Sequence, residues 1–219
     1  MMVGFFSFLV KYLPVLLEGT IMTLQLTVLS ITFGTIIGLF VALAKISKSK
    51  FLSIPASLYT WVIRGVPLLV QLFFLYFGLP QVGIELSPFS AAVIGLSVCS
   101  GAYIAEIIRA GIQSIDKGQL EAAYSLGMSY AQAMRRIIIP QAYRRLIPPM
   151  GNEFISMLKN SSLVTTIAMV ELMRTATHIS SSTFRPLESF VAAGLLYLVL
   201  TTIFVLIFGR LERRLTVYE

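Results

Sequence analysis

The chain contains one long interval that is too polar to cross a membrane, residues 116–140, which read DKGQLEAAYSLGMSYAQAMRRIIIP. At its start Asp116 can cap a helix, and Gln119, three positions later, completes the pattern of a capping box. Gly127 can end that helix by adopting the left-handed conformation. The first half of the interval therefore predicts a short helix followed by a glycine turn.

The second half of the interval repeats these signals. Ser129 and Gln132 form a second capping-box pattern, and Pro140 is expected to close the helix that begins there. Arg135 and Arg136 add two positive charges to this second helix. A helix, a glycine turn and a second helix predict an L-shaped projection held between hydrophobic segments.

The composition places the rest of the chain in lipid. The 219 residues are 57% hydrophobic and 12% charged, with a mean hydropathy of +0.86, whereas soluble domains are about 25% charged. The net charge of +7 comes from basic residues at the edges of apolar segments, a pattern typical of membrane topology and lipid headgroups rather than of nucleic-acid binding. The single cysteine, Cys99, argues against a disulfide framework or a cysteine metal site.

Five segments are predicted to cross the bilayer, for which about 20 residues suffice. Residues 1–13 precede them as a short apolar stretch expected at the interface, and no cleavable signal peptide is expected. Pro148 and Pro149 are expected to break the chain before the fourth span, and a short external helix carrying Glu171 and His178 is expected after it. The predicted spans cover about residues 14–44, 55–79, 89–108, 150–170 and 187–208.

The positions of the basic residues orient these spans. Of the 17 Lys and Arg residues, thirteen fall on one side of the arrangement and three on the other, with Lys159 inside the fourth span. The positive-inside rule then places the N-terminus outside and the C-terminus in the cytoplasm. We therefore predict an all-α, polytopic membrane bundle, one domain over residues 1–219, with the loop 116–140 on the cytoplasmic side between spans three and four.

Two spacings within the spans predict particular contacts. Gly34 and Gly38 form a GxxxG pair, for which packing inside the chain is favoured over a dimer interface. Glu106 and Arg109 stand three residues apart at the cytoplasmic end of the third span, so they can pair on one face of a helix.

The fourth span is unusually polar. Glu153 and Lys159 are six residues apart, which is about 9 Å along a helix and about 120° around it, so they cannot readily pair with each other. An ionisable residue in a span costs about 2.5–3.5 kcal/mol and therefore needs a partner or a water-filled cavity. Three neutral polar residues recur at helical intervals beside them: Asn152, Ser156 and Asn160.

Two interpretations of this span remain open. In the first, the polar residues line a cavity for an amino acid, in which Glu153 takes the amine or a basic side chain and Lys159 takes the carboxylate. Gln71 and Ser100 are weaker candidates for the same lining. In the second, Glu153 pairs with Arg64 or Arg145 near the cytoplasmic face, and Lys159 pairs with another helix.

Other kinds of chemistry lack their motifs. The sequence has no G-x-S-x-G, so a serine nucleophile would lack its usual turn, and no catalytic residue is predicted. It has no G-x-x-x-x-G-K-[ST] phosphate-binding loop, so ATP would have to be bound by another polypeptide. His178 has no plausible metal-ligating partners, and no metal or other cofactor is expected.

The polar interval resembles the EAA loop of binding-protein-dependent ABC importers. The resemblance rests on the spacing of Glu121-Ala122-Ala123, Gly127, Ile137 and Pro140, with Ile139 where the family usually has leucine. It implies that the loop docks on a cytoplasmic ATPase. The residues that it assigns to this coupling are Glu121, Ala122, Ala123, Gly127, Arg135, Arg136 and Pro140. For Glu121, a first-turn position favoured by the helix dipole is an equally good explanation.

Two further stretches, 103–112 and 151–155, resemble the polar amino-acid permeases, including those for arginine, histidine, glutamine and cystine. This resemblance implies a dimer of permeases, identical or not, with two ATPase subunits and an extracytoplasmic solute-binding protein, in a bacterial cytoplasmic membrane. The acidic Glu153 favours basic amino acids, but cystine and glutamine stay open.

Two other functional classes were weighed against an importer subunit. An ion-coupled secondary carrier would need an internal repeat with broken helices, and none is found in the sequence. An intramembrane hydrolase would need a nucleophile with its base, or a set of metal ligands, and the sequence shows neither pattern.

Overall fold

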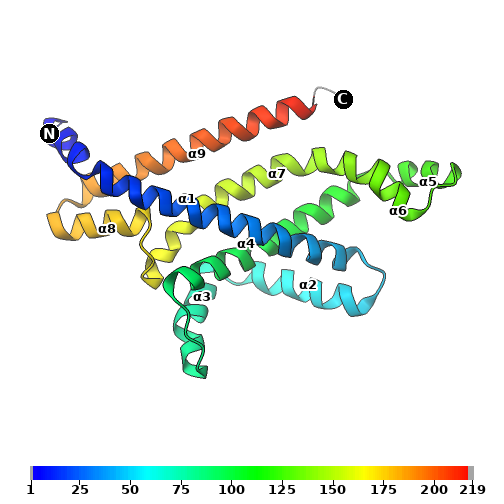
Figure 1. Cartoon of the computed structure of the whole chain (residues 1–219), viewed down its shortest axis with the longest axis horizontal. Helices are drawn as coiled ribbons and strands as arrows, with labels where there is room; N and C mark the ends of the chain where they lie inside the picture. The colour runs from blue at the N-terminus through cyan, green and yellow to red at the C-terminus, as the bar shows by residue number, and fades with distance from the viewer. Residues whose placement is uncertain (1, 217–219) are drawn as a thin grey trace.

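The computed structural model describes residues 2–216, with side chains over residues 5–214, and contains no strand within that range. Figure 1 shows the arrangement of its helices. In chain order the helices and helical turns are α1 (Met2–Ile46), α2 (Lys50–Gly65), α3 (Leu68–Phe73), η1 (Phe74–Gly78), η2 (Leu79–Val82), α4 (Pro88–Gln113), α5 (Lys117–Ser125), α6 (Tyr130–Ala133), η3 (Met134–Ile138), α7 (Ile139–Asn160), η4 (Ser161–Ile167), α8 (Leu172–Thr183) and α9 (Pro186–Thr216).

The helices form an elongated bundle with distinct ends. The long helix α1 packs along α4, and α7 packs against both α4 and α9. The short helix α8 lies against α1 and α9 at the end of the bundle that holds the N-terminus (Figure 1). Helices α5 and α6 project from the opposite end, where α1 ends. The prediction of an all-α membrane bundle is confirmed.

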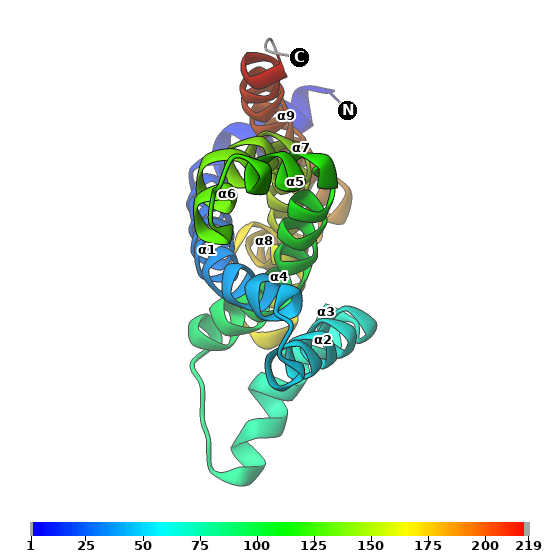
Figure 2. The same ribbon diagram turned by 90° about the vertical axis from the view of Figure 1, so that its right-hand side faces the viewer.

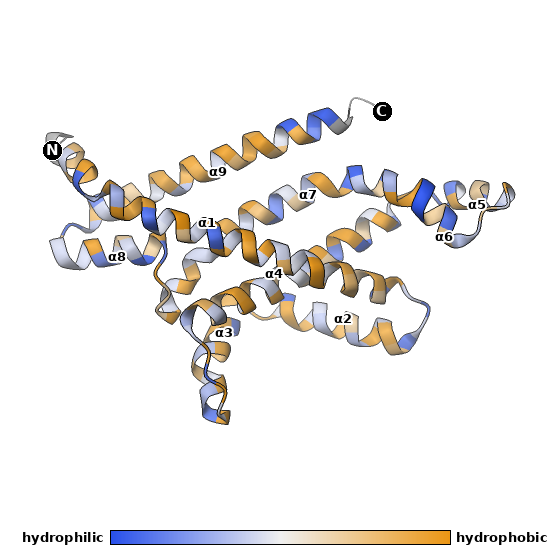
Figure 3. Cartoon of the chain, viewed as in Figure 1, coloured by the Kyte–Doolittle hydropathy of each residue, from blue (hydrophilic) through white to orange (hydrophobic). Residues whose placement is uncertain are grey.

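Apolar composition identifies some of the spans directly. Three helical stretches are long and apolar enough to cross a membrane: Phe5–Ile46, Pro88–Gln113 and Pro186–Arg214. The bent pair of Lys50–Gly65 and Leu68–Val82 adds a fourth if it is counted as one span. Figure 3 shows the hydrophobic residues that dominate α1 and α9. Helix α7 overlaps the predicted fourth span only over residues 150–160, and it carries Arg144, Arg145, Glu153 and Lys159. It packs against α4 and α9 without being apolar enough for this criterion.

Several expected breaks in the helices are absent. Residues 2–13, expected to be separate from the first span, continue into it as one helix with Pro14 inside. Pro148 and Pro149 also lie inside α7, which runs unbroken to Asn160. An internal proline costs about 3 kcal/mol, and the packing of these long helices against their neighbours outweighs that cost.

A break occurs instead inside the predicted second span. Helices α2 and α3 meet at an angle of 102°, because Pro67 disfavours a helical conformation at Val66, which is extended. The side-chain amide of Gln71 donates to the carbonyls of Ile63 at 2.8 Å and Val66 at 2.9 Å, and so closes the bend. Figure 2 shows α2 and the turns after it at the edge of the bundle.

The glycine pair of α1 forms its tightest contact with α4. A Cβ atom on Gly38 would lie 2.7 Å from the side chain of Ile104, and one on Gly34 would overlap the hydroxyl of Ser100. That hydroxyl donates to the carbonyl of Ser30 at 3.1 Å. The GxxxG pair therefore packs within the chain, as predicted, and allows two long helices to approach closely.

Polar side chains fasten the helices near the end that carries α5 and α6. The ammonium of Lys45 donates to Glu106 and, at 2.7 Å, to Thr60. Glu106 also pairs with Arg109, whose Nη2 lies 2.8 Å from its Oε2, as the three-residue spacing predicted. The Lys45–Glu106 pair thus joins α1, α2 and α4, because the ammonium contacts α2 and the carboxylate belongs to α4.

A second carboxylate joins helices at the other end. Glu171, fully buried, caps α8 by accepting hydrogen bonds from the backbone N–H groups of Met173 and Arg174, both at 2.8 Å. Tyr197 of α9 donates to the same carboxylate at 2.9 Å, and Thr23 of α1 lies 3.4 Å from it. A short helix was predicted in this segment, but no local sequence pattern indicated that the carboxylate of Glu171 would be buried.

Gly38→Ala is expected to lower the free energy of unfolding by about 1–3 kcal/mol, because the added methyl group overpacks the contact with Ile104. Unfolding of the detergent-solubilised protein by sodium dodecyl sulfate measures this. Gly194→Ala is the matched control, since a Cβ there meets nothing within 4 Å, and it should leave stability unchanged or raise it. Equal effects of the two substitutions would contradict the close packing of α1 and α4.

Candidate functional site

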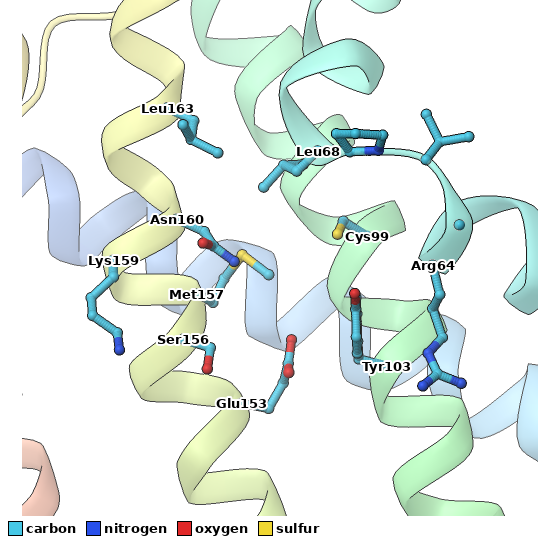
Figure 4. Close-up of a pocket in the computed structure, with 13 residues that line it drawn as sticks. Arg64, Leu68, Cys99, Tyr103, Glu153, Ser156, Met157, Lys159, Asn160 and Leu163 are labelled. Carbon is cyan, nitrogen blue, oxygen red and sulfur yellow. The ribbon is translucent and has the colours of Figure 1, made fainter.

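A cavity of about 590 Å³ lies where α7 faces α4 and the α2–α3 bend (Figure 4). Its lining mixes charged, polar and apolar side chains. The residues that line it are Arg64, Gly65, Val66, Pro67, Leu68, Cys99, Tyr103, Glu153, Ser156, Met157, Lys159, Asn160 and Leu163.

One wall of the cavity is a face of α7. Glu153, Met157 and Asn160 recur at positions i, i+4 and i+7, which share one side of a helix. Figure 4 shows Glu153 pointing from α7 toward α4, whereas the side chain of Lys159 lies on the other side of α7. Lys159 is exposed. It therefore stands at the rim of the cavity and not opposite Glu153.

The opposite wall comes from α4 and the end of α2. Cys99 and Tyr103 are four residues apart on α4 and so face the cavity together. The guanidinium of Arg64 lies 5.2 Å from the centre of the Tyr103 ring, a cation–π distance. Tyr59 donates to the carbonyl of Val98 at 2.6 Å and so fixes α2 against α4.

The charged groups of this cavity have no partners within the described part of the chain. Neither the carboxylate of Glu153 nor the guanidinium of Arg64 forms a hydrogen bond or an ion pair with any residue that the structure describes. Arg145, the other partner considered for Glu153, donates to the carbonyl of Ser114 at 2.6 Å. Charged groups within a membrane protein need a counter-charge or water, so an anion and a cation facing one cavity suit a zwitterionic ligand.

The predicted lining residues divide into two groups. The cavity brings together Glu153, Ser156, Lys159 and Asn160. Three others lie apart from its lining. Asn152 is exposed elsewhere on α7, Ser100 is buried between α4 and α1, and the amide of Gln71 closes the α2–α3 bend.

Sequence reasoning missed the wall opposite α7. Arg64 was considered as an ion-pair partner of Glu153 and not as part of the lining, and Tyr103 and Cys99 were not considered as lining. Their proximity to α7 depends on the bend after Gly65, and only the dipeptide Val66-Pro67 signals that bend in the sequence.

The projection formed by α5 and α6 keeps most of the predicted caps, but the first capping box is absent, because Gln119 Oε1 accepts from Gln141 Nε2 at 3.3 Å. Asp116 Oδ1 accepts from the backbone N–H of Gly118 at 2.6 Å, and Gly127 has a φ of 75°. The Ser129–Gln132 capping box is present in both directions, at 3.4 Å and 2.9 Å. The glycine turn and the second box are confirmed.

A small apolar cluster holds this projection to the bundle. Ile115, Ile138 and Ala142 are buried together, and Ala123 and Ala133 are also buried. The residues of the projection that face outward include Glu121, Ala122, Arg135 and Arg136. The outward face also exposes Tyr124, Leu126 and Tyr130. The projection therefore has an apolar base and an outer surface that mixes charged and apolar side chains.

Two other details of the projection differ from expectation. Pro140 does not close the second helix. It is the second residue of α7, and the π-helical turn η3 leads from α6 directly into this helix, so the helical path continues past the proline. Glu121 is the fifth residue of α5, which begins at Lys117, so it is not in the first turn and the dipole explanation is wrong.

Comparisons with known proteins agree with this arrangement. The profile of the family described as binding-protein-dependent transport system inner membrane component matches residues 34–217. The arginine transport system permease protein ArtQ of Bacillus subtilis is 43% identical over 211 residues, which cover 96% of each chain. The L-cystine transport system permease protein TcyB of Bacillus subtilis is 42% identical over 209 residues, covering 95% of this chain and 89% of that one.

A solved structure is also similar. It is described as the crystal structure of an amino acid ABC transporter with histidines, and it superposes with a TM-score of 0.92 at 50% identity. The match covers 96% of this chain and 98% of that chain.

Gly127→Ala is expected to loosen the projection, because a side chain in the left-handed conformation costs about 1–2 kcal/mol. Amide hydrogen exchange of α5 and α6 should accelerate about 5- to 30-fold. Gly127→Asn should cost less, since asparagine adopts this conformation more readily. A Cβ at Gly127 meets nothing within 4 Å, so unchanged exchange in Gly127→Ala would contradict a conformational role for this glycine.

Proposed function

Because the chain belongs to the family of binding-protein-dependent transport system inner membrane components, we propose that it is the permease subunit of an ABC importer for polar amino acids. The observation that supports this most strongly is the 43% identity to an arginine permease over 96% of both chains. The chain is the membrane component of such a transporter, and ATP hydrolysis belongs to a separate ATPase subunit.

The solute pathway is the cavity between α7 and α4. Glu153 would bind the amine or the basic side chain of the solute, and the basic residues of the lining would bind its carboxylate. Ser156 and Asn160 can complete the remaining hydrogen bonds. A carboxylate in the pathway favours basic amino acids over cystine and glutamine.

Coupling to the ATPase would use the projection of α5 and α6. Its outward residues Glu121, Arg135 and Arg136 would contact the ATPase, as the EAA pattern implies. The helical path is continuous from Met134 through η3 and α7 to Asn160, so a displacement of the projection moves the wall that carries Glu153. This is gating by rigid-body motion around a solute site.

The assembly implied by this function contains more than one chain. It consists of two permease copies, identical or different, with an ATPase dimer and an extracytoplasmic solute-binding protein, in the cytoplasmic membrane of a bacterium. The relatives that support this placement come from Bacillus subtilis.

The function is tested by reconstituting into liposomes the complex that a tag on this chain isolates from its native cells, with the solute-binding protein supplied at the other face. We expect uptake of labelled arginine with ATP at the ATPase face and none with ADP. An ion-coupled carrier would instead lose uptake when ionophores collapse the ion gradients. Uptake of arginine, glutamine and cystine that does not depend on ATP would contradict the proposal.

Glu153→Gln and Lys159→Met are each expected to slow arginine uptake about tenfold, because each removes a charge offered to the solute while keeping a side chain of similar size. If Glu153→Gln slows the uptake of arginine alone, this carboxylate binds the basic side chain of the solute. If it slows the uptake of arginine and glutamine equally, the carboxylate binds the α-amine. Glu18→Gln and Lys11→Met, exposed on α1, are the controls. If both cavity variants moved arginine, glutamine and cystine at unchanged rates, the site would be wrong.

A further inference from the structure

Helix α2 carries a polar stripe that the proposed solute site does not use. Ser53, Ser57, Thr60 and Arg64 recur at i, i+4, i+7 and i+11, so they share one face of the helix. The other exposed residues of α2 are largely apolar, including Phe51, which is 92% exposed. A polar stripe along a helix of a membrane bundle indicates contact with water or with a polar partner, and within this stripe Thr60 is buried against the ammonium of Lys45.

Cavities follow this stripe in series. A second cavity, of about 400 Å³, is lined by Lys45, Ser57, Thr60, Trp61, Arg64, Gly65 and Glu106. It shares Arg64 and Gly65 with the cavity of Glu153. A third, of about 390 Å³, shares Ser57 and Trp61 with the second and is otherwise lined by Ser53, Ile54 and Leu58. The series therefore runs from the solute site toward the end of the bundle where α1 meets α2.

Among the basic residues of the second cavity, Arg64 stands out by its lack of partners. The ammonium of Lys45 is bound to Glu106 and Thr60, and Arg109 occupies the other oxygen of Glu106. Arg64, by contrast, has only the Tyr103 ring beside it within the described residues. Its guanidinium keeps its hydrogen-bond donors available at the junction of two cavities.

We propose that Arg64 binds the α-carboxylate of the solute as it passes from the cavity of Glu153 into the second cavity, and that the polar face of α2 lines the exit to the cytoplasm. This inference rests on the proposed function. A guanidinium suits the role because it offers two parallel N–H groups to a carboxylate. Stacking on Tyr103 orients it without using those N–H groups. The carboxylate and the amine of one amino acid would then contact α2 and α7, respectively.

The first test compares two ligands that differ in the carboxylate. Arginine and agmatine, which lacks the carboxylate, are titrated calorimetrically into the purified permease–ATPase complex. Arg64→Gln should raise the dissociation constant of arginine about tenfold or more. The dissociation constant of agmatine should stay within about twofold of the wild-type value. Arg64→Lys, which keeps the charge, should retain much of the arginine affinity. Lys50→Gln, at the start of the same helix and outside all three cavities, should change neither ligand.

The outcomes separate this inference from the proposed function. If Arg64→Gln weakens the binding of arginine and of agmatine equally, or changes the binding of neither, the proposed role of Arg64 is overturned. A wild-type complex that neither binds nor transports any of arginine, glutamine and cystine overturns the proposed function instead.

A second test addresses the exit path without any solute. In a Cys99→Ala background, Ser57→Cys and Leu52→Cys place one thiol on the polar stripe and one off it. A charged, membrane-impermeant thiol reagent needs a hydrated thiolate, so it should modify position 57 about tenfold faster or more. Equal rates at the two positions would overturn the aqueous path along α2, even if an Arg64 variant failed to fold.

Discussion

A charge inside a membrane protein must meet an opposite charge, a set of hydrogen-bond partners or water. The bundle meets this constraint at both of its ends. Glu106 joins Lys45 and Arg109 at one end, and Glu171 collects donors from three helices at the other. Glu153 and Arg64, by contrast, have no such partners in the described chain. The cavity between them is therefore the place where a bound molecule or water would supply these partners.

The projection was predictable because short-range rules decide it. A capping side chain acts within three residues, and the left-handed turn at Gly127 depends on that residue alone. The same rules failed for the prolines. Pro14, Pro148 and Pro149 lie inside helices that packing maintains, whereas Pro67, which was read as part of a span, coincides with a sharp bend. The local cost of proline is similar in each case, and the surrounding contacts decide whether the helix breaks.

Half of the candidate site could be read from the sequence. Helical periodicity alone places Glu153, Ser156 and Asn160 on one face of α7, and all three line one cavity. The other wall depends on a 102° bend between two helices, which brings Arg64 to Tyr103 across 39 positions of sequence. Gln71 and Ser100 were chosen because they are polar residues in apolar runs, yet both donate to backbone carbonyls. Polarity within a span thus shows that a residue needs a partner, but it does not show which one.

The π-helical turn η3 has a consequence for the genetic variation that this chain tolerates. A π turn holds one residue more than the α-helical turn it replaces, and it stands at Met134–Ile138, immediately before α7. Deleting a single residue there would restore regular geometry and leave hydropathy almost untouched. Because the wider turn absorbs the extra residue, the later side chains of α7 would keep their orientation relative to the projection, whereas a deletion further along α7 would rotate all later side chains by about 100°. Alignments that slip by one position in this turn would pair the wrong residues of the solute site, although the helices themselves would match.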